Sequence, residues 1–456
     1  MTLKFIEIFG YRGFKENARL DFAAPNGNSG SGLTILTGPN NSGKSSVLEC
    51  LRTRSGHENV SFTSGTRNSS IESVEIKFHT NNGVEILKSL TRGSSETVRE
   101  NIDPMVEIFV LPSRRTFPPY FGRQTLNRRE YLNNSALPPQ RAAMLNNFAF
   151  RLFNIHKAPQ KFNELLKEAL GFEAKWTLDL SDQGQHFVKF FNGEHTHSSD
   201  GMGEGIVSIF SILDSLYDSS PGNVIVIDEP ELSLHPSLQK RLKGILLRYA
   251  KDRQIIISTH SPYFVDVQAI AMGAHLARIV TTQNGTKIHQ LSSESKDIIL
   301  ALAKNNLHNP HIFGLDAREL FFLEERVILT EGQEDVMLFP TIFDQLEVPS
   351  PGNFFGWGAG GASNVIKLCT ILKDLGFSKV AALFDGDKTE EAQRCRQKFP
   401  EYYFSCIPAK DIRNKKARKA TEKIEGLLDD NYVVKGEFFI EAKAIAWELY
   451  SKLNSF

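Results

Sequence analysis

Short runs of consecutive apolar residues dominate the pattern in the middle of the chain. V-I-V-I at 224–227 and I-I-I at 255–257 are β-branched runs, and L-T-I-L-T stands at 33–37. Runs of this length without polar alternation are typical of strands buried on both faces of a parallel sheet. The pattern therefore predicts an α/β fold, with the chemistry at the carboxyl ends of its strands.

Other stretches alternate between apolar and polar residues, as strands with one solvent-facing side do. Residues 4–9 alternate, and residues 18–22 suit a hairpin partner for them. Three further stretches, at 71–79, 84–90 and 106–112, also alternate and are separated by turns. We expect these three to form an antiparallel sheet that is added to the parallel one.

Between residues 128 and 170 the pattern becomes helical, with a proline break at 137–139. Basic side chains recur through this stretch: Arg128, Arg129, Arg141, Arg151, Lys157, Lys161 and Lys167. We interpret residues 115–175 as a helical insertion. Its basic side chains either contact nucleic acid or a second copy of the chain, or they line a solvated helix face.

The composition limits the class of protein. With 456 residues the chain is long enough for two or three domains, and 41% hydrophobic and 23% charged residues are typical of soluble globular proteins. The 53 basic and 53 acidic residues cancel, so any contact with nucleic acid must use local patches. The four cysteines form no C-x-x-C pair, no apolar run approaches the roughly 20 residues that span a bilayer, and the N-terminus lacks a signal-peptide profile. We expect a cytoplasmic protein.

The run at 33–37 leads directly into G-P-N-N-S-G-K-S-S at 38–46, a full G-x-x-x-x-G-K-[ST] motif between a predicted strand and a predicted helix. Glycines let backbone N–H groups wrap phosphates, the lysine reaches the outer phosphates, and the next serine can bind Mg²⁺. The expected nucleotide-binding residues are Gly38, Asn40, Asn41, Ser42, Gly43, Lys44, Ser45 and Ser46. Ser45 is also an expected Mg²⁺ ligand.

Two carboxylates, Asp228 and Glu229, follow the run at 224–227. One acid that holds Mg²⁺ and a neighbour that polarises a water are the minimum needed to hydrolyse ATP. We therefore expect Asp228 to bind the metal and Glu229 to be catalytic. The run at 255–257 leads into S-T-H, where His260 is well placed to sense the γ-phosphate, although a lone histidine is more often structural.

A Ser/Gly-rich turn, H-T-H-S-S-D-G-M-G at 195–203, opens the apolar helix that precedes the acid pair. The free N–H groups of a helix start, with Ser198 or Ser199 and small glycines beside them, can approach a phosphate closely. We expect Ser199, Gly201 and Gly203 to contact nucleotide.

A second set of acids lies in the last third of the chain. R-V-I-L-T-E-G-Q-E-D at 326–335 predicts a strand, a tight glycine turn and a helix. Glu331 ends the strand and Asp335 lies one turn up the helix, so both can face one point. Glu334 is the alternative second acid.

V-A-A-L-F-D-G-D at 380–387 predicts a buried strand that ends in Asp385 and Asp387, which project to the same side. Acidic pairs at the ends of neighbouring parallel strands provide the oxygen ligands that Mg²⁺ or Mn²⁺ prefers. No histidine or cysteine stands beside them in the sequence, which argues against zinc. Glu331, Asp335, Asp385 and Asp387 are therefore expected to be both metal ligands and catalytic residues.

The order of these motifs resembles two known classes of domain. The phosphate loop, the Ser/Gly-opened helix, D-E-P and S-T-H resemble the ATPase heads of the ABC class, of the RecF and Rad50 kind, over residues 1–310. E-G-x-x-D followed by D-x-D resembles a Toprim domain, the metal-binding fold of topoisomerases, primases and some nucleases. Toprim domains also carry a downstream lysine, for which Lys410, Lys415, Lys416 and Lys435 are alternatives.

An ABC-type head followed by a Toprim domain resembles the OLD (overcoming lysogenisation defect) family of nucleases, which is similar to effectors of Gabija and retron anti-phage systems. The resemblance implies an ATPase domain over 1–315 and a Toprim nuclease domain over 316–456. It also implies ATP and Mg²⁺ as cofactors and a homodimer or higher even assembly, in which the Ser/Gly turn of one subunit completes the nucleotide site of the other. A defence-system partner, a reverse transcriptase with non-coding RNA or a helicase, is a further expectation.

Two functions fit these motifs. The first is a metal-dependent endonuclease, acting on DNA more readily than on RNA, whose Toprim site is controlled by the nucleotide state of the ATPase. The second is an ATP-dependent clamp or sensor that binds nucleic acid without cleaving it and acts through a partner. The four acids favour the first, because a binding module does not need them.

Overall fold

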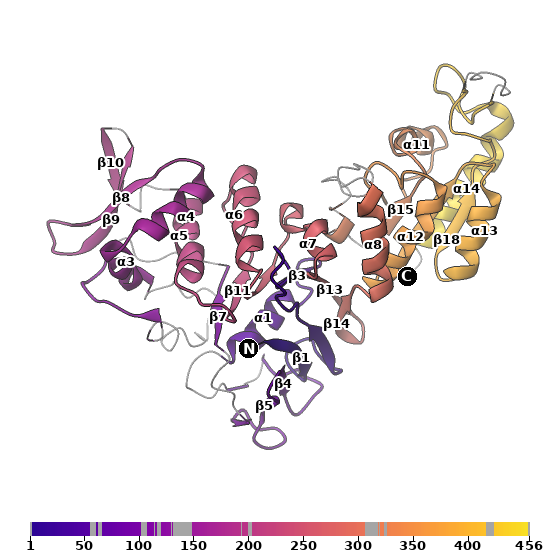
Figure 1. Cartoon of the computed structure of the whole chain (residues 1–456). Helices are drawn as coiled ribbons and strands as arrows, with labels where there is room; N and C mark the ends of the chain where they lie inside the picture. The colour runs from indigo at the N-terminus through magenta and orange to yellow at the C-terminus, as the bar shows by residue number, and fades with distance from the viewer. Residues whose placement is uncertain are drawn as a thin grey trace. The chain divides into compact units, whose positions relative to one another are not determined.

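The computed structural model describes residues 2–54, 61–62, 66–101, 107–113, 115, 120–128, 130, 148–192, 194–198, 203–305, 318, 320–322, 326–415 and 424–454. Contacts between residues divide the chain into two compact units, Met1–Ile288 and His289–Phe456 (Figure 1). The two units contain separate sheets, so each is described by itself.

A six-stranded sheet forms the centre of the first unit. Its strands lie in the order β14 (Gly285–Gln290), β13 (His275–Thr282), β3 (Leu33–Thr37), β12 (Gln254–Ser258), β11 (Val224–Asp228) and β7 (Ile108–Leu111). The pairings from β13 through β7 are parallel. Val224 and Val226 pack into a hydrophobic core on one face of β11, and the alternate residues Ile225 and Ile227 are also fully buried. The prediction of a parallel sheet buried on both faces is confirmed.

An antiparallel sheet completes this core. Its order is β2 (Ala18–Asp21), β1 (Leu3–Phe9), β4 (Glu75–Thr80), β5 (Val84–Ser89) and β6 (Thr97–Glu100). Buried and half-buried residues alternate along β4 and β5. The buried side chains join those of α1 (Lys44–Arg52) in one hydrophobic cluster. The predicted added sheet is therefore present.

The prediction for residues 106–112 is wrong in one respect. The strand in this stretch, β7, pairs in parallel with β11 and belongs to the six-stranded sheet. All four of its residues, I-F-V-L, are buried, as a strand covered on both faces requires. The antiparallel sheet is completed instead by β6, T-V-R-E, whose short polar sequence carries little strand signal.

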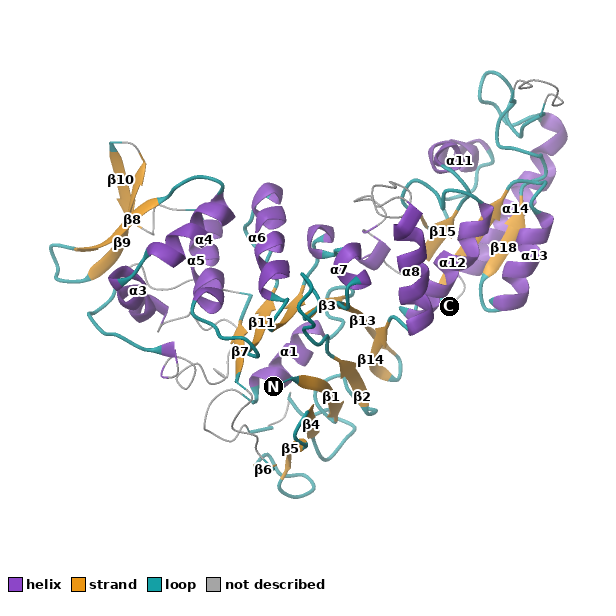
Figure 2. Cartoon of the chain, viewed as in Figure 1, coloured by secondary structure: helices purple, strands orange, loops and turns teal. Residues whose placement is uncertain are grey.

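Helices and a small third sheet make up the rest of the first unit, as Figure 2 shows by colour. They are α3 (Phe148–Lys157), α4 (Gln160–Leu170), β8 (Lys175–Leu180), β9 (His186–Asn192), β10 (His195–Ser198), α5 (Glu204–Tyr217), α6 (Pro236–Tyr249), η2 (Pro262–Phe264) and α7 (Val267–Ala271). Helix α4 contacts both α5 and α6, and the three lie side by side in Figure 1. Within the predicted helical stretch, residues 131–147 lie outside the described residues.

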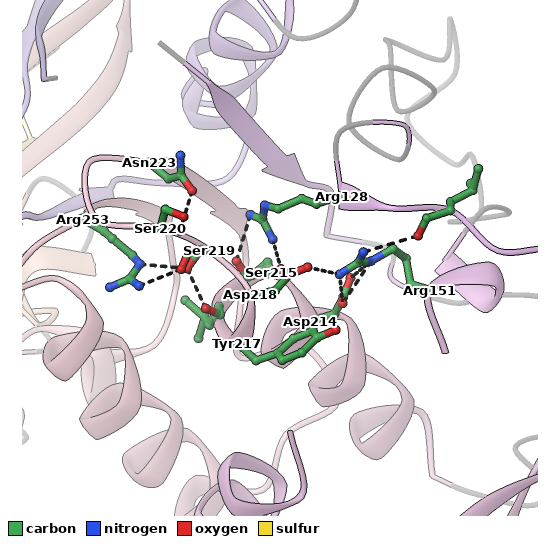
Figure 3. Close-up of polar contacts among 12 residues, drawn as sticks. Arg128, Arg151, Asp214, Ser215, Tyr217, Asp218, Ser219, Ser220, Asn223 and Arg253 are labelled. Carbon is green, nitrogen blue, oxygen red and sulfur yellow. Dashed lines mark hydrogen bonds and ion pairs between the residues drawn. The ribbon is translucent and has the colours of Figure 1, made fainter. Parts of the chain in front are cut away.

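Two arginines of the predicted insertion, Arg128 and Arg151, point toward the C-terminal end of α5 (Figure 3). Arg151 is almost fully buried and pairs with Asp214 at 2.9 Å and with Asp218. Arg128 also pairs with Asp218 and donates to the carbonyl of Ser215 at 3.1 Å. The bond from Arg128 satisfies a carbonyl in the last turn of α5, at the negative end of the helix dipole. For these two arginines the structure shows a local role in holding α5.

The second unit is built on a four-stranded sheet in the order β16 (Asn353–Phe354), β15 (Arg326–Leu329), β17 (Lys379–Phe384) and β18 (Tyr403–Cys406). All three pairings are parallel. Its other elements are α8 (Ser293–Asn305), η3 (Leu320–Phe322), α11 (Gln333–Gln345), α12 (Ala362–Asp374), α13 (Thr389–Lys398) and α14 (Gly436–Asn454). Among the described residues, none of the helices is both long and apolar enough to cross a bilayer.

The division between the units lies earlier than the expected boundary at 315/316, which falls outside the described residues. Helix α8 belongs to the second unit by its contacts. It packs on α12, and Ser292, just before it, donates its N–H to Asp374 at 2.8 Å.

The Arg151–Asp214 pair predicts a large effect on stability. Removing one partner leaves a buried charge without compensation, which typically costs about 3–5 kcal/mol. We expect Arg151→Met to lose free energy of unfolding in that range, measured by urea denaturation. Adding Asp214→Leu to it should recover part of the loss, because the orphaned carboxylate is then gone.

Lys157→Met is the matched control, since Lys157 is exposed on the same helix. It should change the unfolding free energy by less than about 0.5 kcal/mol. Equal stability of the Arg151 and Lys157 variants would show that the buried pair does not hold α3 to α5.

Candidate functional site

The phosphate loop joins β3 to α1 through backbone conformations that few residues adopt. Gly38 and Gly43 have φ of +134° and +104°, and Asn41 has φ of +60°. A Cβ at Gly38 would lie 2.1 Å from the carbonyl oxygen of Ile279, so only glycine fits there. The loop ends at the first residue of α1, which directs the positive end of the helix dipole toward it.

Lys44 lies inside this loop. Its Nζ donates to the carbonyls of Gly38 and Pro39, at 2.8 Å each, and the residue is 5% exposed. Burial lowers the pKa of Lys44 to about 8, and the nearby carboxylates of Glu229 and Asp228 oppose that shift. The predicted phosphate-binding lysine and the predicted acid pair therefore belong to one site.

The acid pair stands where β11 and β12 end side by side. Asp228 is in register with Ser258, whose hydroxyl donates to the Asp228 carboxylate. Glu229 adopts a left-handed backbone, with φ of +47°, and donates its N–H to the carbonyl of Ser258 at 2.9 Å. Because β3 is the next strand, the parallel register brings the phosphate loop to the same edge.

His260 lies across from Glu229, with its Nε2 3.9 Å from Glu229 Oε1. Burial lowers the pKa of His260, and the charge of Lys44 lowers it further. Both effects favour the neutral imidazole, which can accept or donate a hydrogen bond at a phosphate. The structure thus places His260 at the predicted site.

Two further residues of this site were missed by the sequence interpretation. Glu231 accepts a hydrogen bond from the N–H of His260 at 2.6 Å and from the hydroxyl of Thr259 at 2.8 Å. Arg115 donates to the carbonyls of Asp228 at 2.6 Å and Glu229 at 2.9 Å. The second glutamate of D-E-P-E was a visible signal, whereas Arg115 stands in an unremarkable S-R-R.

The Ser/Gly-rich turn is described only in part. Ser199 and Gly201 lie outside the described residues, so their predicted contacts remain predictions. Gly203 is the N-cap of α5, with an extended ψ of 136°. Ser198 is the last residue of β10. The helix therefore begins where the sequence predicts, although a short strand precedes the turn.

A separate acidic cluster lies at the carboxyl ends of β15 and β17 in the second unit. Glu331 follows β15 and accepts the N–H of Asp385 at 3.0 Å. Asp335 is in the first turn of α11 and accepts the N–H of Gly332 at 2.9 Å. The two acidic motifs, which are about fifty residues apart in the sequence, are thus in direct contact.

Burial and mutual repulsion make these carboxylates hard to ionise. Burial raises the pKa of Asp385 to about 8, with added contributions from Glu331, Asp335 and Asp411. Burial likewise raises the pKa of Asp335 to about 6, and it raises the pKa of Glu331. Such a cluster is stabilised by cations, because each added positive charge favours the ionised acids.

Two other acids of these motifs, Asp387 and Glu334, form ion pairs with basic side chains. Asp387 is half exposed and pairs with Lys388 at 2.9 Å. Glu334, the alternative second acid, pairs with Arg413. Asp335, by contrast, is 8% exposed, and its charge raises the pKa of Asp385.

Asp411 is a member of the cluster that the sequence interpretation missed. It is 6% exposed, follows β18 by a short loop, and pairs with Lys415. A lone aspartate in A-K-D-I carries no recognisable motif, so only the sheet topology brings it to the site.

Of the candidate lysines, Lys415 has contacts that link it to the acidic cluster. Its charge lowers the pKa of both Asp335 and Asp385. Lys435 donates instead to Asn414 at 3.0 Å, and Lys416 lies outside the described residues. The structure therefore favours Lys415 over Lys435.

The donor set of this cluster consists of carboxylate oxygens, which suit Mg²⁺ or Mn²⁺. In the part of the chain that the structure describes, no group of three or more His, Cys, Asp or Glu side chains is already arranged to hold an ion. Glu331, Asp335, Asp385, Asp387 and Asp411 are the residues that could do so. Their carboxylate chemistry fits a divalent ion.

Two family models match the chain. One, described as "AAA domain, putative AbiEii toxin, Type IV TA system", matches residues 33–266, just over half of the chain. The other, the Toprim domain of proteins like the overcoming lysogenization defect protein, matches residues 322–387. The first match covers the phosphate loop, the acid pair and His260, and the second covers Glu331 through Asp387.

The chain is similar in part of its length to three nucleases. The chain is 28% identical over 236 residues to an OLD nuclease of Thermus scotoductus, covering 46% of this chain and 43% of that one. It is 25% identical over 174 residues to the Old nuclease of Escherichia phage P2, covering 37% and 29%. It is 22% identical over 248 residues to Endonuclease GajA of Bacillus cereus, covering 51% and 39%.

In each case the matched stretch covers less than half of the relative's own length. Two of these relatives bear the name that the second family model also bears. The resemblance predicted from the motifs is therefore confirmed at the level of family and fold. This chain belongs to the OLD family: an AAA/ABC-type ATPase domain followed by an OLD-like Toprim domain.

Proposed function

We propose that the chain is a metal-dependent endonuclease whose cleavage site in the second unit is controlled by ATP bound in the first. The observation that carries the proposal is the acidic cluster, where Glu331 accepts the N–H of Asp385 at 3.0 Å and the charges of Glu331, Asp335 and Asp411 raise the pKa of Asp385. A module that only bound nucleic acid would repel the phosphate backbone with these groups. Several buried carboxylates at the ends of parallel strands are instead suited to hold divalent ions.

Divalent ions would supply a more acidic water and stabilise the leaving oxygen of a phosphodiester, as two-metal sites do. Mg²⁺, with Mn²⁺ as the alternative, is the proposed metal, and Glu331, Asp335, Asp385 and Asp387 are the proposed ligands. Asp411 is added to them because it faces Asp385. Lys415 is proposed as the cation beside the reacting phosphate, since it already neighbours two of the acids.

The first unit is proposed to bind and hydrolyse ATP with Mg²⁺. The loop N–H groups and Lys44 would hold the phosphates, and Ser45 and Asp228 would hold the ion. Glu229 would polarise the attacking water, and neutral His260, 3.9 Å away, would contact the γ-phosphate. Two observations support this: β3, β12 and β11 are neighbouring parallel strands, and the charges of both acids raise the pKa of Lys44 against the effect of burial.

The proposed substrate is nucleic acid, with DNA favoured over RNA. The names of two relatives, OLD nuclease and Endonuclease GajA, support cleavage of nucleic acid as the activity of those proteins. We further propose a cytoplasmic effector of anti-phage defence that works with a partner, as the resemblance to Gabija and retron effectors implies.

Substitutions in the first unit should separate ATP binding from hydrolysis. Lys44→Ala removes the loop cation, so binding of a fluorescent ATP analogue should fall below detection at micromolar concentrations. Glu229→Gln keeps the shape but loses the base, so binding should persist while turnover falls by about 10²–10⁴-fold. Asp385→Asn, in the other unit, is the control and should bind ATP normally. Normal turnover in the Glu229 variant would assign the catalytic role to another residue.

Substitutions in the second unit should abolish cleavage and leave ATP binding intact. We expect Asp385→Asn and Asp335→Asn each to lower plasmid cleavage with Mg²⁺ by about 100-fold or more, because each removes a charge that holds the metal. Asp344→Asn is the matched control, since Asp344 is exposed on the same helix as Asp335. Wild-type cleavage rates in both cluster variants would refute the nuclease proposal and favour the ATP-dependent clamp.

A homodimer or higher even assembly is proposed on the resemblance to ABC-type heads. Light scattering at micromolar concentration should give at least twice the mass of the chain, 51.2 kDa. A monomer with full ATPase activity under those conditions would contradict this proposal.

A further inference from the structure

Arg115 is a buried cation behind the proposed ATPase site. It follows β7, and the residue is only 2% exposed. Its Nη1 donates to the carbonyls of Pro112 at 3.0 Å and Asp228 at 2.6 Å, and its Nη2 donates to the carbonyl of Glu229 at 2.9 Å. Its Nε donates to the hydroxyl of Ser208 at 2.7 Å. Three elements of the first unit therefore meet on one guanidinium.

This arrangement requires arginine. A planar guanidinium offers donors in fixed directions, and here they reach three carbonyls and one hydroxyl. A lysine ammonium has three donors on a flexible stem and cannot reproduce that fork. Burial lowers the pKa of Arg115 to about 10, while the nearby acids, Asp228 first, oppose the shift. A costly buried charge is thus placed directly behind the acid pair.

One of the carbonyls that Arg115 binds belongs to Glu229, whose backbone is strained. Glu229 has φ of +47°, a strained conformation that non-glycine residues rarely adopt. Its N–H is fixed by the carbonyl of Ser258 at 2.9 Å, and its carbonyl is fixed by Arg115. These two bonds determine the direction in which the Glu229 side chain leaves the backbone.

Arg115 also binds α5, the helix that begins at the Ser/Gly-rich turn. Ser208 lies in its second turn and accepts from Arg115. The first turn touches the segment that follows the acid pair: a Cβ at Gly205 would lie 2.3 Å from the carbonyl oxygen of Ser233, and the Ser233 hydroxyl donates to Glu204 at 3.1 Å. The start of α5 is therefore attached to the Glu229 segment at two separate points.

We propose that Arg115 is a positioning residue that ties α5 to the peptide of Glu229, so that the Ser/Gly-opened end of α5 and the catalytic carboxylate keep a fixed relation. The inference rests on the proposed hydrolysis of ATP at this site. Its consequence is that a ligand or subunit contacting the start of α5 alters the orientation of Glu229, and so the rate of hydrolysis, without touching ATP itself.

A role in packing alone makes a different prediction. If Arg115 only stabilised the fold, cutting its bond to α5 would lower thermal stability and impair ATP binding and turnover together. A positioning role changes the turnover number and leaves nucleotide affinity unchanged, because Glu229 is aimed at the water and the loop of Lys44 holds the phosphates.

The test uses two serines of the same helix in the full chain. Ser208→Ala removes the acceptor for Arg115 Nε, whereas Ser211→Ala is the same change three residues on, at a hydroxyl that bonds to the Ser208 carbonyl of its own helix. ATP turnover at saturating nucleotide, the dissociation constant of a fluorescent ATP analogue and the melting temperature are measured for each. We expect about tenfold slower turnover for Ser208→Ala, the size of one hydrogen bond to a charged group, with affinity unchanged. Ser211→Ala should match the wild type.

Arg115→Lys provides a second, independent change. It keeps a positive charge but not the fork, so turnover should fall at least as far as in Ser208→Ala while the ATP analogue still binds. Wild-type turnover in both variants, or a parallel loss of affinity and turnover in Ser208→Ala, overturns the inference while leaving the proposed ATPase in place. Absence of hydrolysis in the wild type would instead refute the proposed function on which the inference rests.

Discussion

Both candidate sites depend on the parallel pairing of buried strands. When neighbouring strands run the same way, the residues that follow them meet at one edge of the sheet, however far apart they lie in the sequence. In the first unit this brings Lys44, Asp228 and His260 together after β3, β11 and β12. In the second it brings Glu331 and Asp385 together after β15 and β17.

The two sites differ in the charges that surround their carboxylates. In the first unit the acids face buried cations, since Lys44 lies in front of them and Arg115 behind. In the second unit carboxylates face one another, and the pKa of Asp385 rises to about 8. Cations of the protein itself oppose the acids of the first site, whereas we propose that divalent ions do so in the second. This difference is the physical reason for proposing nucleotide chemistry in one and metal-dependent cleavage in the other.

The sequence predicts most of the two sites because their residues stand next to buried strands or in spaced motifs. Lys44, Glu229 and Asp385 were found in this way. Arg115 and Asp411 were not, because each lies in a loop without a motif and reaches its site only through the tertiary fold. Strand β7 was assigned to the wrong sheet since a four-residue run cannot specify its partner. The local role of Arg151 could not be predicted for a related reason: charge is visible in a sequence, but burial of the side chain that carries it is not.

The central claim is that ATP in the first unit controls metal-dependent cleavage in the second. It is tested most directly by incubating the purified chain with plasmid DNA, and in parallel with transfer RNA, in Mg²⁺ or Mn²⁺, with ATP, with ADP and without nucleotide. The account predicts cleavage of the plasmid that requires the metal, stops on addition of EDTA, and changes in rate with the nucleotide. Intact plasmid and intact RNA under every combination, from protein that binds ATP normally, would contradict it.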